Sequence, residues 1–289
     1  MTSDTRTLEL PDASIAYDVR TPAGASEHPP LLLIGQPMTA SGFDALAPQL
    51  DDRVVVTYDP RGLGRSERRD DSAAHDPAQQ ASDLHALIQE LGMGPVDIFG
   101  SSSGGAVAGL ALVTAHPEDV HVLVAHEAPL TSILPDAEHA AAAFRGVEEQ
   151  YQAQGFGAGM AAFIGMTSWR GEFNKAYTAQ EFPHPAQYGM PTEDDGSRDD
   201  PLMSGVSRSV TALEPDIAAL IAAPTRIVVG VGTESGDVLT GRSAAALADM
   251  LDTELVEFRG GHGGFMADEW GQPGDPATFA AQLRDALED

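Results

Sequence analysis

The feature of this sequence that most constrains its fold is the alternation of short apolar runs with stretches of helical periodicity. Leu31–Ile34 is apolar throughout and is followed by Gly35, which is typical of a strand buried on both faces. Between Pro77 and Leu91 apolar residues recur at helical spacing, and a proline in the first turn favours a helix. Strands that alternate with helices form a parallel sheet with helices on its faces. The sequence therefore predicts an α/β fold with a doubly wound, mostly parallel sheet.

The same patterns place the remaining elements of this sheet. A hairpin is predicted where residues 8–10 and 15–19 flank a turn that contains Pro11. Further strands are expected at residues 54–58, 96–99, 120–125, 225–231 and 254–258. Further helices are expected at residues 43–50, 106–115, 243–251 and 276–287.

The alternation stops between residues 130 and 223. Helical stretches at residues 137–154 and 160–169 are followed by a polar, proline-rich stretch at residues 183–201. Long loops without structure are uncommon in compact domains, so we expect an inserted helical cap, with an irregular excursion as the alternative. The predicted organisation is a core domain of residues 1–129 and 224–289 and a cap of residues 130–223.

The composition excludes several classes of partner and chemistry. The chain has 44 Asp and Glu against 16 Lys and Arg, and its formal net charge of −28 disfavours nucleic acid and anionic membranes as partners. It has no cysteine, which excludes disulfides, thiolate nucleophiles and cysteine-ligated metals. The first residues do not resemble a secretory signal, and no apolar run is long enough to cross a bilayer. We therefore expect a cytoplasmic protein.

A serine between glycines directly follows the strand predicted at residues 96–99. Residues 100–104 read Gly-Ser-Ser-Ser-Gly, and a helix is predicted after them. The pattern G-x-S-x-G alone is common, but between a strand and a helix it is typical of a nucleophilic serine on a tight turn. Glycines allow the chain to fold back closely, and the helix N-terminus favours a developing oxyanion. Ser102 is the predicted nucleophile.

A nucleophilic serine needs a general base, and the base needs an acid that orients it. Among nine histidines, His262 stands out because it follows the last predicted strand and has small neighbours, in Gly-Gly-His-Gly-Gly-Phe at residues 260–265. A flexible loop at this position can carry an imidazole over the carboxyl edge of the sheet. The other histidines lie in predicted helices, strands or surface loops. His262 is therefore the predicted base.

These motifs together resemble those of the α/β-hydrolase superfamily, and the resemblance covers essentially the whole chain. The matching segments are LLLIGQ at 31–36, YDPRGLGRS at 58–66, GSSSG at 100–104, AHEAP at 125–129 and GGHGGF at 260–265. In that superfamily two backbone N–H groups hold the oxyanion. The resemblance implies that Gln36 and Ser103 supply these N–H groups.

The acid of the triad is left open between three carboxylates. Superfamily members often place the acid after the strand that follows the cap, where Glu234 and Asp237 stand, although neither fits the usual Gly-x-x-Asp spacing. A minority of families place it after the strand before the cap, where Glu127 stands. This arrangement resembles that of zearalenone-type lactonases, whose acid is a glutamate at the matching position. The resemblance favours Glu127, with Glu234 and Asp237 as alternatives.

Aromatic and methionine side chains near the predicted site are candidates for a substrate pocket. Met38 and Phe43 follow the oxyanion segment and could line the entrance. Similar residues in the cap could form an apolar roof, although at helical spacing such residues more often belong to a core. The cap candidates are Met160, Phe163, Met166, Trp169, Phe173 and Tyr177.

The expected activity is that of a serine hydrolase that forms an acyl-enzyme and needs neither a metal nor an organic cofactor. The expected partner is a medium-sized, largely apolar ester or lactone. Ser102 disfavours the epoxide hydrolases and haloalkane dehalogenases, which use an aspartate at this position. A C–C bond hydrolase, a perhydrolase and a non-catalytic ligand-binding protein of the same fold are the alternatives. The sequence leaves the oligomeric state open, a homodimer included.

Overall fold

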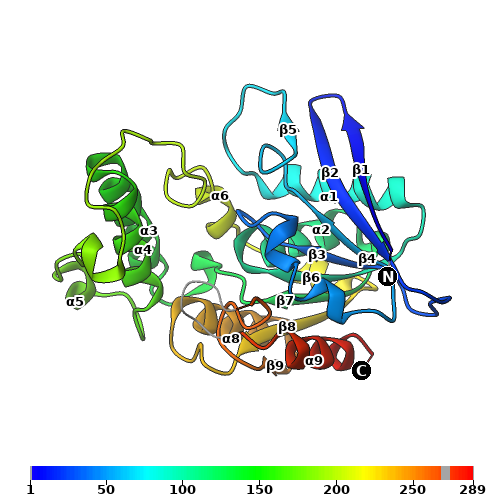
Figure 1. Cartoon of the computed structure of the whole chain (residues 1–289). Helices are drawn as coiled ribbons and strands as arrows, with labels where there is room; N and C mark the ends of the chain where they lie inside the picture. Colours follow the sequence, from blue (N-terminus) through cyan, green and yellow to red (C-terminus); the bar gives the residue numbers. More distant parts are fainter. Residues whose placement is uncertain (1, 268–273, 289) are drawn as a thin grey trace.

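One sheet forms the centre of the molecule (Figure 1). In the computed structural model, which describes residues 2–267 and 274–288, the strand order is β1-β2-β4-β3-β6-β7-β8-β9, and β5 pairs with β2. β2 pairs in antiparallel fashion with both β1 and β4, while β4, β3 and β6 to β9 run parallel to one another. The predicted mostly parallel α/β sheet is confirmed. The strands are β1 (Thr2–Leu10), β2 (Ala13–Thr21), β3 (Leu31–Ile34), β4 (Val55–Tyr58), β5 (Glu67–Arg68), β6 (Val96–Ser101), β7 (Val120–His126), β8 (Arg226–Gly232) and β9 (Leu255–Phe258).

The order of the strands reverses at β3. The chain passes from β3 to β4 on one side of it, and then places β6 on the other side. In open α/β sheets, ligands bind beyond the carboxyl ends of the strands at such a reversal. The segments that follow β3 and β6, which contain Gln36 and Ser102, therefore meet where a binding site is expected.

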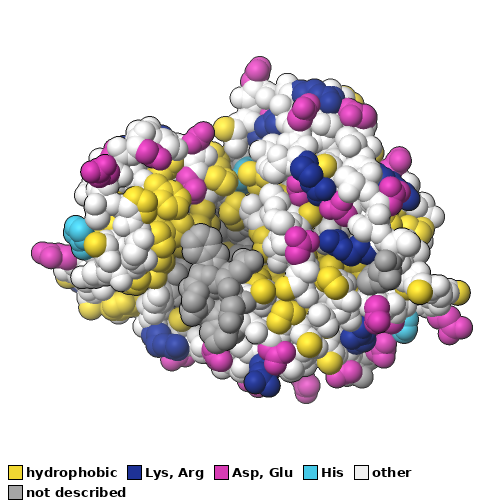
Figure 2. Space-filling view, in the orientation of Figure 1, with side chains coloured by type: hydrophobic (Ala, Val, Ile, Leu, Met, Phe, Trp, Pro, Cys, Tyr) yellow, Lys and Arg dark blue, Asp and Glu magenta, His cyan; other side chains and the backbone are white. Residues whose placement is uncertain are grey.

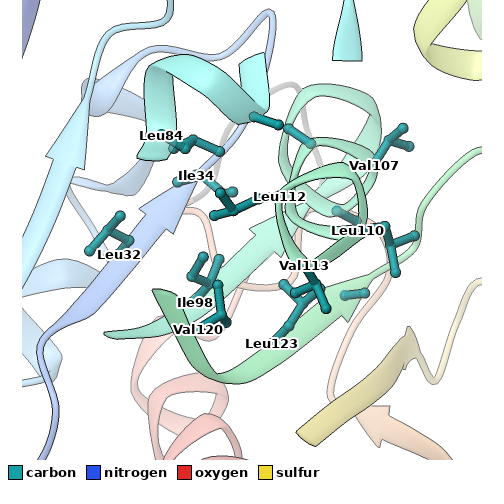
Figure 3. Packing of buried hydrophobic residues seen from close by; sticks show 14 of the residues in the cluster. Leu32, Ile34, Leu84, Ile98, Val107, Leu110, Leu112, Val113, Val120 and Leu123 are labelled. Atoms are coloured by element: carbon teal, nitrogen blue, oxygen red, sulfur yellow. The ribbon is translucent and has the colours of Figure 1, made fainter. Parts of the chain in front are cut away.

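Helices cover both faces of the sheet. Leu84 and Leu110, from two neighbouring helices, are fully buried against one face, and Figure 3 shows how they pack over β3, β6 and β7. Phe279 is fully buried against the other face. Burying one such side chain contributes about 1.5–3 kcal/mol to the stability of the folded state. Both cores therefore stabilise the positions of the strands. The helices on the sheet are α1 (Pro77–Leu91), α2 (Ala108–Ala115), α8 (Leu239–Leu251) and α9 (Pro276–Glu288).

Residues 43–50 do not form the helix that their spacing predicts. The structure has two 3-10 turns instead, Ala40–Phe43 and Ala47–Gln49. Pro48 lacks an N–H group, and its ring is not tolerated in a helix interior, so the turn before it cannot continue. Phe43 and Leu46 are nevertheless buried, because the 3-10 turns keep their side chains on the sheet side.

The segment between β7 and β8 forms a helical lobe beside the sheet (Figure 1). Its two longest helices pack on each other around Val147, Tyr151 and Met166. The polar, proline-rich stretch is irregular except for a 3-10 turn at Pro185–Tyr188. The helices of this segment are α3 (Ala137–Gln154), α4 (Phe156–Thr167), α5 (Lys175–Thr178), α6 (Arg208–Thr211) and α7 (Ile217–Ala222).

The last two helices of this segment belong to a different core from α3 and α4. Val210 of α6 and Leu220 of α7 are buried in the core on the sheet, where α7 contacts α2 and α8. The cap boundaries at residues 130 and 223 therefore stay a prediction. In the described part of the chain, no helix is both long and apolar enough to span a membrane.

Candidate active site

Ser102 lies on a sharp turn between β6 and the helix that follows. Its backbone angles are φ 62° and ψ −157°, a region that residues other than glycine rarely adopt. A π-helical turn, Ser103–Val107, comes next, and regular α2 begins only at Ala108. The helix predicted from residue 106 therefore begins two residues later, because the elbow absorbs the first turn.

The glycines of the elbow are needed because backbone segments approach closely. A Cβ on Gly100 would lie 2.6 Å from the carbonyl oxygen of Gly105, and a Cβ on Gly105 would lie 2.2 Å from that of Ile34. A Cβ on Gly104 would lie 1.8 Å from the Cβ of Gln36. The turn therefore packs directly against β3 and the segment after it, which is the steric requirement that the G-x-S-x-G pattern predicts.

Glu127 directly follows β7, with φ 50° and a side chain that is 0% exposed. Its Oε1 accepts hydrogen bonds from the backbone N–H of Gly232 at 2.8 Å and from the Ser235 hydroxyl. Its Oε2 accepts from Thr240 Oγ1 at 2.8 Å and from His262 Nδ1 at 2.6 Å. Four donors thus surround one buried carboxylate, which satisfies a charge that burial would otherwise make costly.

These contacts decide the charge state of Glu127. Burial alone would raise the pKa of the Glu127 carboxyl, but the hydrogen bond and the charge of His262, with a further bond from Ser235, hold the pKa well below its ordinary value. Glu127 is therefore an ionised acceptor at neutral pH.

His262 lies in the loop after β9, and its side chain is 45% exposed. Because the ionised Glu127 can only accept, Nδ1 of His262 carries the proton of their shared hydrogen bond. This bond leaves Nε2 as the basic nitrogen of the ring. Ser102 and His262 both line the same cavity.

The structure places the other two candidate acids differently. Glu234 and Asp237 are exposed residues of the loop between β8 and α8. Glu234 lines the cavity, but within the residues that the structure describes neither carboxylate bonds to His262. Of the three candidates, only Glu127 is brought to the imidazole.

Gln36 and Ser103, the two expected oxyanion donors, lie side by side. The carbonyl oxygen of Gln36 accepts from the Gly104 N–H at 3.3 Å and from the Ser103 hydroxyl at 3.1 Å. These bonds hold the segment after β3 against the elbow. Ser103 and Pro37 line the cavity, while Gln36 is buried at 5% exposure.

A cavity of about 790 Å³ lies between the helical lobe and the carboxyl ends of the strands. Figure 2 shows the hollow between the two parts of the molecule, with hydrophobic side chains gathered on the surfaces around it. Its apolar lining residues are Pro37, Pro129, Phe144, Val147, Phe163, Leu202, Val238, Leu239, Met266 and Ala267. A volume of this size accommodates a medium-sized organic molecule.

Of the predicted pocket residues, Phe163 lines the cavity, while Met38, Phe43, Met160 and Trp169 are not among its lining residues. Phe43 stacks on Phe265 beneath the site, with 5.5 Å between ring centroids. Met38 packs against the same core, and Met160 against the core of the lobe.

The remaining lobe candidates also pack within the lobe. The ring of Trp169 lies 5.3 Å from that of Tyr177, and its Nε1 donates to the Glu172 carbonyl. Met166, Phe173 and Tyr177 are buried in the lobe core and do not line the cavity. Sequence reasoning missed Phe144 and Val147, whose spacing of three residues on α3 was the available signal, because periodicity does not say which face of a helix meets a cavity.

The cavity also has a charged wall. Arg208 and Glu148 line it as an ion pair, and Arg170 contributes a second guanidinium. No charged lining residue other than Glu234 was foreseen from the sequence, because the partners of exposed charges are decided by tertiary contacts.

His126, the neighbour of Glu127, is a packing and hydrogen-bonding residue. It is completely buried, and its Nδ1 lies 3.1 Å from Ser101 Oγ. The rings of Phe99, Phe258 and Phe279 surround it, with centroid distances of 5.6–5.7 Å. Burial lowers the pKa of His126 to about 4, so this imidazole is neutral at physiological pH.

Comparisons with known proteins agree with this architecture. A family model described as "Alpha/beta hydrolase family" matches residues 31–282. The Bacillus subtilis (strain 168) protein called "Uncharacterized hydrolase YraK" is 31% identical over 292 residues, which cover 100% of this chain and 97% of that protein.

Solved structures share the fold at lower identity. A thermophilic esterase from Thermogutta terrifontis has a TM-score of 0.64 and 20% identity, covering 99% of this chain and 98% of that one. A meta-cleavage product hydrolase has a TM-score of 0.60 and 15% identity, covering 98% of this chain and 97% of that one. Together with the family match and the full-length relative, these likenesses lead to one assignment: the chain belongs to the alpha/beta hydrolase family.

Proposed function

We propose that this protein is a serine hydrolase that cleaves a carboxylic ester or lactone through an acyl-enzyme, with Ser102, His262 and Glu127 as its catalytic triad. One observation carries the proposal: the 2.6 Å bond between His262 Nδ1 and the buried Glu127 carboxylate. This bond orients the imidazole, frees its Nε2, and does so on the wall of the cavity that Ser102 also lines. A buried, ionised carboxylate that is bonded to an imidazole on a cavity wall is typical of a catalytic site.

The proposed reaction follows from these positions. Ser102 Oγ attacks the acyl carbonyl while His262 Nε2 takes its proton, and the Glu127 carboxylate stabilises the imidazolium that forms. His262 then gives the proton to the leaving alcohol oxygen, which breaks the ester bond and leaves the acyl group on Ser102. Water attacks this ester with His262 again as the base, which releases the acid and restores the serine.

The oxyanion of each tetrahedral intermediate needs donors close to Ser102. The backbone N–H groups of Gln36 and Ser103 are the proposed donors. Ser103 directly follows Ser102, and its hydroxyl donates to the carbonyl oxygen of Gln36, so both residues lie beside the nucleophile. One such donor is typically worth about 3 kcal/mol of the barrier. The following helical turn points its N-terminus to the same place and favours negative charge there.

Substrate choice is proposed to rest on the helical lobe, with residues 130–223 acting as a cap. Phe144, Val147 and Phe163 supply an apolar wall, which favours an apolar acyl or alcohol group. The Thermogutta esterase shares the fold, which is compatible with ester chemistry. A lactone substrate is favoured by the resemblance to zearalenone-type lactonases, in which the triad acid is likewise a glutamate after the strand that precedes the cap.

C–C bond hydrolysis is the second candidate, because a meta-cleavage product hydrolase is among the proteins of the same fold. Perhydrolysis and ligand binding without turnover are the remaining candidates. A fluorophosphonate probe separates catalysis from binding: we expect it to label wild-type protein and to leave Ser102→Ala unlabelled. Folded wild-type protein that resists the probe would contradict the proposal.

The reaction class is tested with a panel of p-nitrophenyl esters, lactones and meta-cleavage products, with Ser102→Ala as the blank. We expect turnover of esters or lactones that is lost in Ser102→Ala. Turnover restricted to the meta-cleavage products would contradict ester or lactone hydrolysis and would show that the protein is a C–C bond hydrolase.

A further inference from the structure

Two imidazoles and one carboxylate come together away from the cavity. His85 lies on α1, His116 is the C-cap of α2, and Asp119 ends the 3-10 turn Pro117–Asp119 that leads into β7. One ligand atom from each of the three side chains lies within 4.8 Å of the others. None of the three residues lines the cavity, and the proposed hydrolase mechanism uses none of them. We propose that they form a binding site for one divalent transition-metal ion of the Zn²⁺ type.

The ligand types point to this class of ion. Zn²⁺ and its neighbours Ni²⁺ and Cu²⁺ bind imidazole nitrogen well, whereas Mg²⁺ and Ca²⁺ prefer sets made of oxygen atoms. Two protein nitrogens, one carboxylate oxygen and a water complete a four-coordinate zinc site. His85 and His116 are 34% and 30% exposed, so the fourth position is open to solvent.

The contact between His85 and Asp119 is close to the geometry that a metal needs. His85 Nδ1 lies 2.6 Å from Asp119 Oδ2, and the two atoms share a proton. Zinc bonds of about 2.0–2.2 Å in a tetrahedron place two ligand atoms roughly 3.3–3.6 Å apart. Exchange of the shared proton for the metal therefore requires these atoms to separate by less than about 1 Å.

The carboxylate is already oriented for this role. Asp119 is 4% exposed, and Gln89 Nε2 donates to its Oδ1 at 3.0 Å, which leaves Oδ2 for the metal. Partners of this kind, which orient a ligand from behind, raise metal affinity markedly. The N–H of Asp119 also bonds to the carbonyl of His116 at 3.1 Å, so these two ligands move as a unit.

His116 is the ligand that has to move. Its ring is stacked on that of His85, with 3.9 Å between centroids and 14° between planes, so the nitrogen lone pairs of the two rings do not converge. The ring is partly exposed, and among the described residues its charged contact is with Glu118, at 3.9 Å, which is too long to hold the ring against rotation. The net charge of −28 adds a general attraction for cations. The bound ion would join α1 to the junction of α2 and β7.

Zinc titration of the full-length protein, first stripped with a chelator, tests the site. By calorimetry we expect one zinc ion per chain, and by thermal melting we expect a higher melting temperature with Zn²⁺ but not with Mg²⁺. His85→Gln and His116→Gln should each raise the dissociation constant at least about tenfold. The melting temperature of each variant without metal shows whether that variant folds. If one variant does not fold, the other variant and the wild-type titration still test the site.

Two controls separate this site from other histidines. His121 is also an exposed imidazole whose Nδ1 lies 3.0 Å from an aspartate, Asp97, but it is not part of a metal-spaced cluster among the described residues. His121→Gln should therefore keep wild-type zinc affinity, and so should His262→Ala. The proposal is overturned if zinc leaves the wild-type melting temperature unchanged, if His85→Gln or His116→Gln binds zinc as wild type does, or if either control loses the zinc response.

Discussion

Ser102 and Glu127 share an uncommon backbone feature, since both hold positive φ angles at the carboxyl ends of adjacent strands. Strain of this kind costs about 1–3 kcal/mol and persists only where the surrounding structure imposes it. Close-packed glycines impose it at Ser102, and four hydrogen bonds impose it at Glu127. The two strained residues are thereby aimed at the site that His262 completes.

Loss of the Glu127 charge should remove most of the activity. In Glu127→Gln the amide cannot stabilise the imidazolium or fix its tautomer, so we expect kcat on a p-nitrophenyl ester to fall by about 10³–10⁴-fold. Glu234→Gln and Asp237→Asn are matched controls on the neighbouring loop and should stay within about twofold of wild type. A near-wild-type rate for Glu127→Gln, with collapse of either control, would transfer the role of the acid to that residue.

His126 should make stability depend on pH. Burial lowers its pKa from 6.5 to about 4, so between these values the unfolded chain binds the proton and the folded chain does not. The free energy of unfolding therefore falls as the pH is lowered through this window, by up to about 1.4 kcal/mol per pH unit from this residue.

The variant His126→Asn isolates this contribution, because it keeps a polar atom near Ser101 and cannot titrate. Denaturant unfolding at several pH values between 7 and about 4 should give a shallower pH dependence for the variant than for wild type. Equal slopes for the two proteins would mean that His126 is protonated in the folded state as readily as in the unfolded chain.

At the scale of elements, local sequence predicted α1 well and α2 less well. α1 begins at Pro77 and ends at Leu91 as predicted, because Asp76 caps its first turn and Gly92 ends it with φ 63°. α2 begins later than its apolar run, because the first turn after Ser102 is π-helical. The late start of α2 arises because the elbow packs against β3. The hydrophobic periodicity of one segment carries no information about such a contact with another segment.

The elbow crosses β3 so closely that we expect no side chain to be tolerated at Gly105. In Gly105→Ala the new Cβ would lie 2.2 Å from the Ile34 carbonyl oxygen, and backbone on both sides leaves no room to relax. We expect a loss of about 1–3 kcal/mol in the free energy of unfolding. Gly24→Ala is the matched control, since a Cβ there meets nothing within 4 Å and its stability should not fall. Equal stability of Gly105→Ala and wild type in urea unfolding would show that the elbow can shift away from β3.

At the scale of the whole molecule, the excess of acidic residues lowers the stability of the folded state. A net charge of −28 repels itself in the folded state, and salt screens this repulsion. We expect the melting temperature to rise as NaCl increases from about 0.01 M to about 1 M, over which the Debye length falls from about 30 Å to about 3 Å.

Buried ion pairs are the competing contribution. Arg53 with Asp97 and Arg61 with Asp83 are shielded from salt because their side chains are at most 6% exposed. Their stabilisation should survive at high salt while the surface repulsion is removed. A melting temperature that falls steadily with NaCl would mean that exposed ion pairs outweigh the net repulsion.

The sequence by itself determined the alternation of the main strands and helices, the parallel sheet and the turn that carries Ser102, because these follow from hydrophobic periodicity and from the steric needs of neighbouring residues. Only the tertiary structure decided that Glu127 rather than Glu234 or Asp237 meets His262, and that Phe144 and Val147 line the cavity while Phe43 and Trp169 do not. The physical reason is distance along the chain. Glu127 and His262 are 135 residues apart, and a contact between them exists only once β7 and the loop after β9 are placed by the whole sheet.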